Sequence, residues 1–290
     1  MKILITGAAG LVGRALDEHC RAKGDEVFAY DRQALDIADY EKVEAEIAEH
    51  RPDAVINCAA WTNVDACEGD PEQTRRVNSL GPENLARASR RVDAVFVTIS
   101  TDYVFDGLKD GFYTQRDNPR PINVYGRFKL ESERRAQAEH ARTIVVRAGY
   151  IFGLGGKNFL STIVTRARNG ERLTAIHDCY GTPTYGRDLA ARLRELAVKD
   201  LPGIYHVTNS GEGASFETFA REALAIAQHP TDSIETVSMD SLPRPAPRPR
   251  NTRLRCVLSP AIGLAPLRPW QEAVVDFVAE LSKRSVSQKT

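Results

Sequence analysis

Apolar and polar residues form alternating blocks along the first half of the chain. Short, almost uninterrupted apolar runs predict strands at Ile3–Ile5, Val27–Tyr30, Ala54–Asn57, Ala94–Ser100 and Thr143–Arg147. The longer segments between them predict helices at about Leu11–Lys23, Tyr40–His50 and Pro82–Arg91, and a further helix opened by Tyr125. Strands without alternating polar positions are buried on both faces, as in a parallel sheet covered by helices. The pattern therefore predicts an α/β fold built on a doubly wound parallel sheet.

The regular alternation of predicted strands and helices ends after Tyr150. Helices are predicted there at Phe159–Arg168, Arg187–Val198 and Phe216–Ala227, with an isolated strand near Ile204–Val207. Such a segment is typical of a smaller lobe set against the carboxyl edge of a sheet. We therefore expect a sheet domain over residues 1–150 and a smaller, mainly substrate-binding lobe over residues 151–290. Residues from about 185 to 208 are expected to return to the sheet domain.

Composition and charge narrow the classes of partner. The 290 residues carry 39 Lys and Arg against 39 Asp and Glu, and this balance predicts no nucleic-acid partner. The apolar runs are shorter than the ~20 residues of a membrane span, and no signal-peptide segment precedes the first strand. The five cysteines form no Cys-x-x-Cys pair, and the six histidines lack metal-ligand spacing. We expect a cytoplasmic protein with reduced thiols, no bound metal and no membrane contact.

Three glycines mark the turn between the first predicted strand and the first predicted helix. Gly7, Gly10 and Gly13 are spaced Gly-x-x-Gly-x-x-Gly within Thr6–Gly13. Glycines at such a turn permit a sharp bend, a close approach of backbone to a pyrophosphate, and tight packing of helix on sheet. The N-terminus of the following helix supplies N–H donors for the phosphates. We interpret residues 1–150 as a Rossmann-like NAD(P)-binding domain.

Polar and small residues at the next strand ends extend this cofactor site. Asp31 follows Val27–Tyr30, where a carboxylate binds ribose hydroxyls and repels a 2′-phosphate, which favours NADH. Arg32, directly after it, could pair with that phosphate instead, so NADPH and NADH both remain open. Asp36 and Ile37 either meet the adenine or form a loop without a binding role. The small residues Asn57–Ala60 suit close passage of the cofactor, or packing alone.

The candidate catalytic residues follow the fourth strand and open the next helix. Tyr125 and Lys129 are four residues apart, so a helix places them on one face. A neighbouring cation favours the phenolate and lowers the tyrosine pKa, which suits proton transfer to a developing alkoxide. Thr101, after strand Ala94–Ser100, can donate a hydrogen bond to the same oxygen. The alternatives without a catalytic role are a half-buried tyrosine beside a solvated lysine, and a Ser/Thr/Asp turn that only ends a strand.

Several longer segments accompany these residues and together indicate a family. They are Gly7–Gly13, Asn57–Asp65, Ser100–Gly107, Pro121–Gly126 with Lys129, Tyr180–Thr184, Gly203–His206 and Arg248–Asn251. With these segments the chain resembles the extended short-chain dehydrogenase/reductases and, more narrowly, the dTDP-4-dehydrorhamnose reductase family. The resemblance covers nearly the whole chain, and Ser100–Gly107 followed by Asn123–Gly126 is more specific than the glycine loop.

The resemblance implies a reaction and a role for each matching residue. A hydride from NADPH or NADH would reduce the C4 ketone of a dTDP-linked 4-keto-6-deoxy-L-sugar, giving dTDP-L-rhamnose. Tyr125 would protonate the C4 oxygen, Lys129 would hold the nicotinamide ribose and lower the Tyr125 pKa, and Thr101 would stabilise the oxyanion. Asp102 would contact the sugar. The residues implied to line the cofactor are Gly10, Leu11, Val12, Asp31, Asp36, Ile37, Ala59, Ala60 and Trp61.

The chain departs from the family pattern at three places. Gly149-Tyr150 stands where many relatives place a tryptophan against the sugar, so Tyr150 becomes the expected sugar-stacking residue. Asp178-Cys179 replaces a frequent Asp-Gln near the substrate. Some relatives bind magnesium at a dimer contact through a glutamate of the first helix; here Arg14-Ala15 predicts no such metal. A homodimer stays open as the oligomeric state.

Other functions are weighed against this one. A reductase of a different nucleotide-linked 4-keto sugar is kept open by Tyr150, and epimerase or dehydratase chemistry resembles more distant branches. A non-catalytic dinucleotide-binding regulator, similar to the β-subunit of methionine adenosyltransferase, shares the fold. Because a binding module needs no proton donor, the joint presence of Thr101, Tyr125 and Lys129 favours an enzyme.

Overall fold

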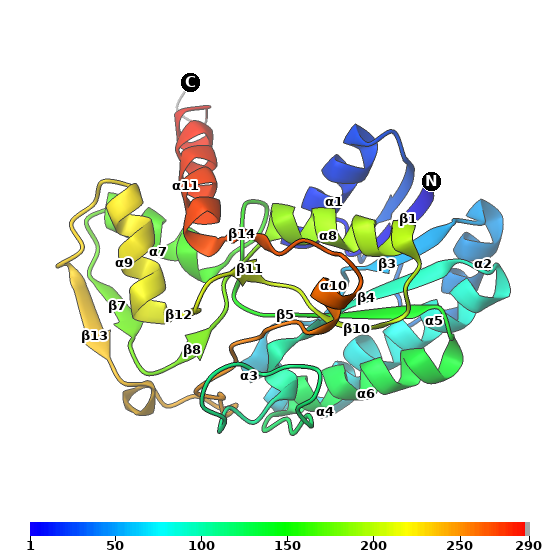
Figure 1. Ribbon diagram of the computed structural model, residues 1–290, viewed down its shortest axis with the longest axis horizontal. Coiled ribbons are helices and arrows are strands. Elements are labelled where there is room, and N and C mark those ends of the chain that lie inside the picture. The colour runs from blue at the N-terminus through cyan, green and yellow to red at the C-terminus, as the bar shows by residue number, and fades with distance from the viewer. Residues whose placement is uncertain (288–290) are drawn as a thin grey trace.

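The computed structural model describes residues 1–287, whose centre is a sheet of six parallel strands (Figure 1). In spatial order the strands are β10 (Gly203–His206), β5 (Thr143–Ala148), β4 (Val95–Thr101), β3 (Ala54–Asn57), β1 (Lys2–Thr6) and β2 (Glu26–Tyr30). The chain runs from β1 outward to β2 and then returns to the other side of β1 as β3. The predicted doubly wound parallel sheet is thereby confirmed, and the order of its strands reverses beside β1, where such folds bind ligands.

Helices cover both faces of this sheet. One face carries α1 (Leu11–Ala22) and α8 (Gly186–Lys199); the other carries α2 (Tyr40–His50), α5 (Gly81–Arg91) and α6 (Val124–Glu139). The alternation along β1 shows why its apolar run is unbroken. Ile3 and Ile5 pack into the core with α1 and α8, whereas Leu4 packs into the core with α2, α5 and α6.

Short helices that the sequence analysis did not assign connect β3 with α5. They are α3 (Val64–Gly69), α4 (Pro71–Arg75) and a π-helical turn, η1 (Arg76–Leu80). Asn63 caps α3 by accepting a hydrogen bond from the Ala66 N–H, and Asp70 caps α4 in the same way from Gln73. Pro71 at the first position of α4 suits a helix start, because that position has no intrahelical N–H partner to lose.

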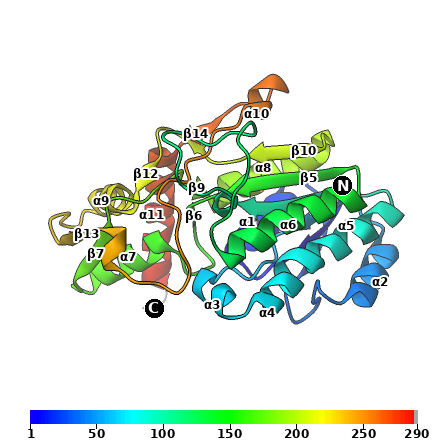
Figure 2. The ribbon, with the colours of Figure 1, turned by 90° about the horizontal axis from the view of Figure 1, so that it is seen from below.

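Both ribbon views show a lobe beyond one end of the sheet (Figures 1 and 2), and this lobe has an apolar core of its own. It packs α7 (Phe159–Arg168), α9 (Phe216–Ile226) and α11 (Trp270–Ser287) with the paired strands β7 (Leu173–Ile176) and β13 (Ile234–Val237). The smaller connecting elements are η2 (Asp102–Val104), β6 (Ile151–Phe152), β8 (Tyr180–Gly181), β9 (Thr184–Tyr185), β11 (Asn209–Ser210), β12 (Ala214–Ser215), η3 (Met239–Ser241), α10 (Leu258–Ala261) and β14 (Leu267–Pro269).

The chain returns from this lobe to the sheet at α8 and β10. Helix α8 packs against α1, and β10 forms the sheet's edge by pairing with β5. The carboxyl ends of the parallel strands therefore share one edge, from which the residues after β1, β3, β4 and β5 emerge. None of the helices within residues 1–287 is both long and apolar enough to cross a membrane.

Candidate active site

The glycine loop between β1 and α1 lies directly against the end of β3. Gly7 has a φ of +69°, and a Cβ built on it would lie 2.5 Å from the Ala59 nitrogen. A Cβ on Gly13 would lie 2.2 Å from the Gly7 oxygen, so this glycine is needed for tight packing of α1 under the loop. The first turn of α1 has no acidic residue and no capping side chain. Its N–H groups are therefore available to an anion.

A cavity of about 450 Å³ adjoins the loop on the side of β2, and we call it the β2-end cavity. It is lined by nine of the predicted cofactor residues: Gly7, Gly10, Asp31, Arg32, Asp36, Ile37, Ala59, Ala60 and Trp61. Leu35 and Val77, which were not predicted, add apolar surface. The Asp31 Oδ1 atom accepts hydrogen bonds of 2.9 Å from the N–H groups of Gln33 and Ala34, which fixes the carboxylate at the rim. Arg32 is exposed beside it.

A second cavity, of about 560 Å³, extends to the end of β4, and we call it the β4-end cavity. The remaining predicted residues line it, apart from Gly13: they are Leu11, Val12, Thr101, Asp102, Tyr125, Lys129 and Tyr150. The two cavities share Gly10, Cys58, Ala59 and Ala60 as a common wall. Two compartments joined across a glycine loop and a helix N-terminus fit the two halves of a dinucleotide.

Tyr125 lies in the first turn of α6, and the cap of that helix determines its place. Asn123 accepts a 2.8 Å hydrogen bond from the Gly126 N–H, and its own amide donates to the Pro247 carbonyl at 2.9 Å. A Cβ on Gly126 would lie 2.2 Å from the Tyr103 oxygen, so glycine lets the helix approach η2 closely. The Tyr125 ring meets the Tyr103 ring edge to face at 6.2 Å. Sequence reasoning did not identify Tyr103, although it lies only two residues after Thr101.

Lys129 is buried one turn further along α6. Its ammonium donates a 2.7 Å hydrogen bond to the Ile99 carbonyl at the end of β4. Burial lowers the pKa of Lys129 to about 8, and the Glu133 carboxylate acts against that decrease. The structure thus brings the predicted phenol and ammonium into one cavity, with the lysine fixed by the backbone of the neighbouring strand.

The electrostatic state of Tyr125 differs from the sequence-based prediction. We expected Lys129 to lower the tyrosine pKa, but burial raises the Tyr125 pKa above its ordinary value. Thr101 favours the phenolate through a hydrogen bond, and the nearby Asp102 carboxylate opposes it. The expectation was wrong because it counted the charge four residues away and not the loss of water around the phenol. A phenol with a raised pKa stays protonated and suits the role of proton donor.

Thr101 and Asp102 form a pair at the carboxyl end of β4. The Thr101 hydroxyl donates to Asp102 Oδ1 at 3.0 Å and accepts a hydrogen bond from the Tyr103 N–H at 3.1 Å. The other Asp102 oxygen is buried with no hydrogen-bond partner among the described residues, and burial raises the pKa of Asp102 to about 6. The site therefore places a hydroxyl donor and a poorly solvated carboxyl beside the Tyr125 phenol.

Two of the three departures from the family pattern, Tyr150 and Cys179, contact each other beside the β4-end cavity. The Tyr150 ring stacks on Phe216 with centroids 4.4 Å apart, and its hydroxyl donates to the Cys179 carbonyl at 3.2 Å. A Cβ on Gly181 would lie 2.2 Å from the ring. Phe216 was not predicted, because no local pattern links it to a residue so far away in the sequence. Tyr150 is thus wedged between elements of the lobe rather than free to turn.

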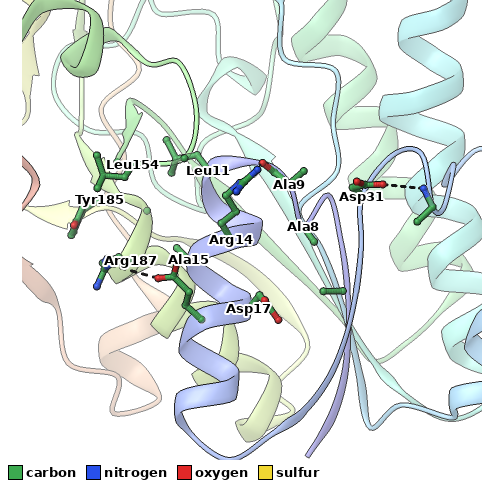
Figure 3. A pocket seen from close by; sticks show the side chains of 16 residues that line it. Ala8, Ala9, Leu11, Arg14, Ala15, Asp17, Asp31, Leu154, Tyr185 and Arg187 are labelled. Atoms are coloured by element: carbon green, nitrogen blue, oxygen red, sulfur yellow. Dashed lines mark hydrogen bonds and ion pairs between the residues drawn. The ribbon is translucent and has the colours of Figure 1, made fainter. Parts of the chain in front are cut away.

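A third cavity, of about 470 Å³, runs along α1 and α8 outside the glycine loop (Figure 3). Arg14 lies at its edge and donates to the Ala9 carbonyl at 2.8 Å, while Arg187 pairs with Glu18 at 3.6 Å. This cavity shares Leu11 with the β4-end cavity, and Ala9 and Asp31 with the β2-end cavity, but the candidate catalytic residues lie elsewhere. Within the described part of the chain, no group of three or more His, Cys, Asp or Glu side chains could hold a metal ion.

Comparisons with known proteins agree with this geometry. A family model described as the RmlD substrate binding domain matches residues 1–283. A dTDP-4-dehydrorhamnose reductase of Mycolicibacterium smegmatis is 39% identical over 281 residues, covering 96% of this chain and 85% of the relative. A crystal structure of a dTDP-4-dehydrorhamnose reductase of Clostridium acetobutylicum superposes with a TM-score of 0.93 at 35% identity, covering 97% of this chain and 100% of that one.

A second solved structure carries the cofactor. The dTDP-4-dehydrorhamnose reductase of Bacillus anthracis, in complex with NADP, superposes with a TM-score of 0.93 at 32% identity, covering 96% of this chain and 99% of that one. The resemblance inferred from the motifs is thereby confirmed. This chain belongs to the RmlD family, whose relatives named here are dTDP-4-dehydrorhamnose reductases.

Proposed function

We propose that this protein reduces the C4 ketone of dTDP-4-dehydro-6-deoxy-L-mannose (dTDP-4-dehydrorhamnose) with NADPH or NADH, forming dTDP-L-rhamnose. The observation that carries the proposal is the convergence of Thr101, Tyr125 and Lys129 in one cavity that continues past the glycine loop. Membership of the RmlD family supplies the substrate class.

Each catalytic side chain has a role that follows from its surroundings. The bound dinucleotide supplies the hydride that reduces the carbonyl carbon. Tyr125 keeps its proton until negative charge develops on the C4 oxygen, and then transfers it there. The Thr101 hydroxyl donates to the same oxygen, and the Lys129 ammonium lies in the same cavity, where it would hold the ribose of the bound nicotinamide. Because the pKa of Lys129 is about 8, this ammonium is present at neutral pH and is lost in the alkaline range.

The remaining predicted residues would bind the cofactor and the sugar. The N–H groups after Gly10 are suited to bind the pyrophosphate. Asp31 and Arg32 lie in the β2-end cavity, where the ribose of the adenosine would bind. Asp102 and Tyr150 line the part of the β4-end cavity left for the sugar. We also place the protein in the cytoplasm, which is supported by five cysteines that are all free of disulfides.

A coupled assay tests the proposal. The loss of NADPH or NADH absorbance is followed with dTDP-4-keto-6-deoxy-L-mannose, and the product sugar is identified. We expect Tyr125→Phe to reduce kcat by about 10²–10⁴-fold, the range of general acid catalysis, with NADPH affinity close to wild type. Unchanged turnover would remove Tyr125 from the mechanism. If the wild-type protein consumes neither cofactor, the result favours the alternative function, a non-catalytic dinucleotide-binding regulator.

One observation favours a second candidate substrate. Tyr150, which stands in the place of a tryptophan, is held between Phe216 and Gly181, with its hydroxyl turned toward Cys179. A wall of this composition could select another nucleotide-linked 4-keto sugar. The same assay, run with a panel of such sugars, separates the two candidates by their kcat/KM values.

A further inference from the structure

A buried ion pair lies behind the catalytic residues, between α6 and the sheet. The Glu133 carboxylate binds the Arg147 guanidinium through two hydrogen bonds, from Nε at 2.9 Å and from Nη2 at 2.6 Å. The exposed fractions of the two side chains are 2% and 4%. A charge pair so far from water is costly, and replacing such a pair with apolar residues is often neutral or stabilising. Stability alone is therefore a weak reason for its presence here.

The ion pair is connected to the end of β4. Ser100 lies opposite Arg147 in the register between β4 and β5, and its hydroxyl donates to the same Glu133 oxygen that accepts from Arg147 Nε. Ser100 is flanked by Ile99, whose carbonyl binds the Lys129 ammonium, and by Thr101. The segment that presents Thr101 is thus held by side chains from α6 on both sides of the peptide.

Glu133 continues the face of α6 that carries the catalytic residues. Tyr125, Lys129 and Glu133 follow one another at intervals of four residues, so they lie in one row along the helix. The Glu133 charge raises the pKa of Lys129 against the opposing effect of burial. The carboxylate is therefore close enough to the ammonium to favour its charged form.

His206 completes the cluster without adding charge. Its Nδ1 atom lies 3.2 Å from the Tyr113 carbonyl and 3.1 Å from the Arg255 carbonyl, so Nδ1 carries the hydrogen. Nε2 is then an acceptor and faces Arg147 Nη1 at 3.4 Å. Burial and the Arg147 charge lower the pKa of His206 to about 3. Arg147 is thus fixed by a neutral imidazole on one side and by Glu133 on the other.

We propose that Glu133 is a positioning residue for the reductase: anchored by Arg147, it fixes the catalytic end of β4 and keeps the neighbouring Lys129 ammonium charged. The inference rests on the proposed function. Tyr125 and Asp102 line the same cavity as Lys129, whereas Arg147 and His206 lie behind Glu133, Arg147 bound to it and His206 bound to Arg147. Among these, Glu133 is the carboxylate that pairs with a buried cation, Arg147.

The test compares variants that remove the Glu133 charge with variants that retain it. Glu133→Gln leaves Arg147 buried without its anion, so the double variant Glu133→Gln/Arg147→Met is made as well, because it removes both charges together. Glu133→Asp retains the charge. Glu139→Gln, near the end of the same helix and partly exposed, is the matched control. Melting temperature and circular dichroism identify the variants that fold.

Two pH profiles provide the readout. We expect the alkaline limb of kcat/KM, where Lys129 loses its proton, to move down by about one pH unit in Glu133→Gln and in the double variant. At pH 8 this shift lowers kcat/KM by about fivefold, whereas values at pH 6 stay within about threefold of wild type. Glu133→Asp and Glu139→Gln are expected to keep the wild-type limb. If Glu133→Gln fails to fold, the double variant and Glu133→Asp decide the question.

NADPH affinity, measured against pH by fluorescence titration, gives the same comparison without the sugar substrate. In Glu133→Gln and in the double variant, NADPH affinity should begin to fall at a lower pH than in wild type, because Lys129 loses its proton at a lower pH. A folded double variant with the wild-type limb in both profiles would overturn the inference, as would an equal loss at every pH. Because the titration needs no turnover, it tests Glu133 even if the wild-type protein proves inactive on the expected sugar.

Discussion

At the scale of single residues, Asp102 is a carboxylate whose charged form the fold destabilises. One oxygen accepts from Thr101, while the other is buried so close to Gly149 that a Cβ on that glycine would lie 2.3 Å from it. Burial raises the pKa of this carboxyl from its ordinary value of 3.8 to about 6. The ionised form is therefore destabilised in the folded protein relative to the unfolded chain.

We expect Asp102→Asn to raise the free energy of unfolding by about 1–2 kcal/mol at pH 7.5, while it lowers turnover. The sign follows from linkage: because the folded-state pKa is the higher one, the folded protein binds the proton more tightly. The contribution of Asp102 to wild-type stability therefore becomes more favourable as pH falls from 6 toward 4, and the advantage of the variant should disappear over that window. Urea unfolding at pH 7.5 and pH 4.5 checks this. A variant less stable than wild type at pH 7.5 would show that the carboxylate is well solvated or paired.

At the scale of elements, the cap of α6 links helix formation to catalysis. Asn123 satisfies the Gly126 N–H with its oxygen and holds the 242–250 segment through Pro247 with its amide. Tyr125 lies in the first turn that this cap defines. Loss of the cap would loosen both the helix start and the segment laid across it.

We expect Asn123→Ala to reduce the free energy of unfolding by about 1–2 kcal/mol and to lower kcat more than a cap variant elsewhere. Asp39→Ala is the matched control, because Asp39 caps α2 through the Lys42 N–H, away from the β4-end cavity. Thermal unfolding gives the stability change, and the coupled assay gives kcat. Equal losses of kcat in the two variants would show that the cap of α6 does not determine the placement of Tyr125.

Helices with a clear apolar periodicity could be predicted from the sequence, whereas very short helices could not. The predicted helices at Tyr40–His50 and Phe159–Arg168 have the same bounds in the structure, since their apolar periodicity and caps coincide. Helices α3 and α4 are too short for periodicity, and their caps alone mark them. Helix α11 carries apolar residues at helical spacing that the sequence analysis left unassigned.

The site was predicted best where its residues are neighbours in sequence. The Tyr125–Lys129 pair and the Thr101–Asp102 pair follow from spacing along a helix and a strand end. The contacts of Tyr150 with Phe216 and Cys179 join segments far apart in the chain, so only the tertiary structure reveals them. The pKa of Tyr125 was missed for a related reason, because burial depends on the whole surrounding fold.

At the scale of the whole molecule, the sheet and the lobe have separate apolar cores. Phe277 of α11 is fully buried in the lobe core beside Phe152, and Phe96 of β4 is fully buried in the core under α2, α5 and α6. The β2-end cavity is lined only by residues before position 80, whereas the β4-end cavity takes part of its wall from the lobe. The β2-end cavity therefore depends on the cores of the sheet alone, whereas the β4-end cavity also depends on the core of the lobe.

This separation gives a prediction for two matched substitutions. Phe277→Ala and Phe96→Ala each remove a fully buried ring, which typically costs about 3–5 kcal/mol of stability. We expect Phe277→Ala to raise KM for the sugar nucleotide by about tenfold or more while NADPH affinity stays within about threefold of wild type, since a shift of the lobe leaves the glycine loop and β2 in place. Phe96→Ala should weaken both, because β4 lies beside the strand that supports the loop. Fluorescence titration of NADPH and steady-state kinetics, both below the melting temperature of each variant, distinguish the two. If NADPH affinity fell as far in Phe277→Ala as in Phe96→Ala, the lobe and the sheet would form one cooperative unit, and the cofactor site would depend on both cores.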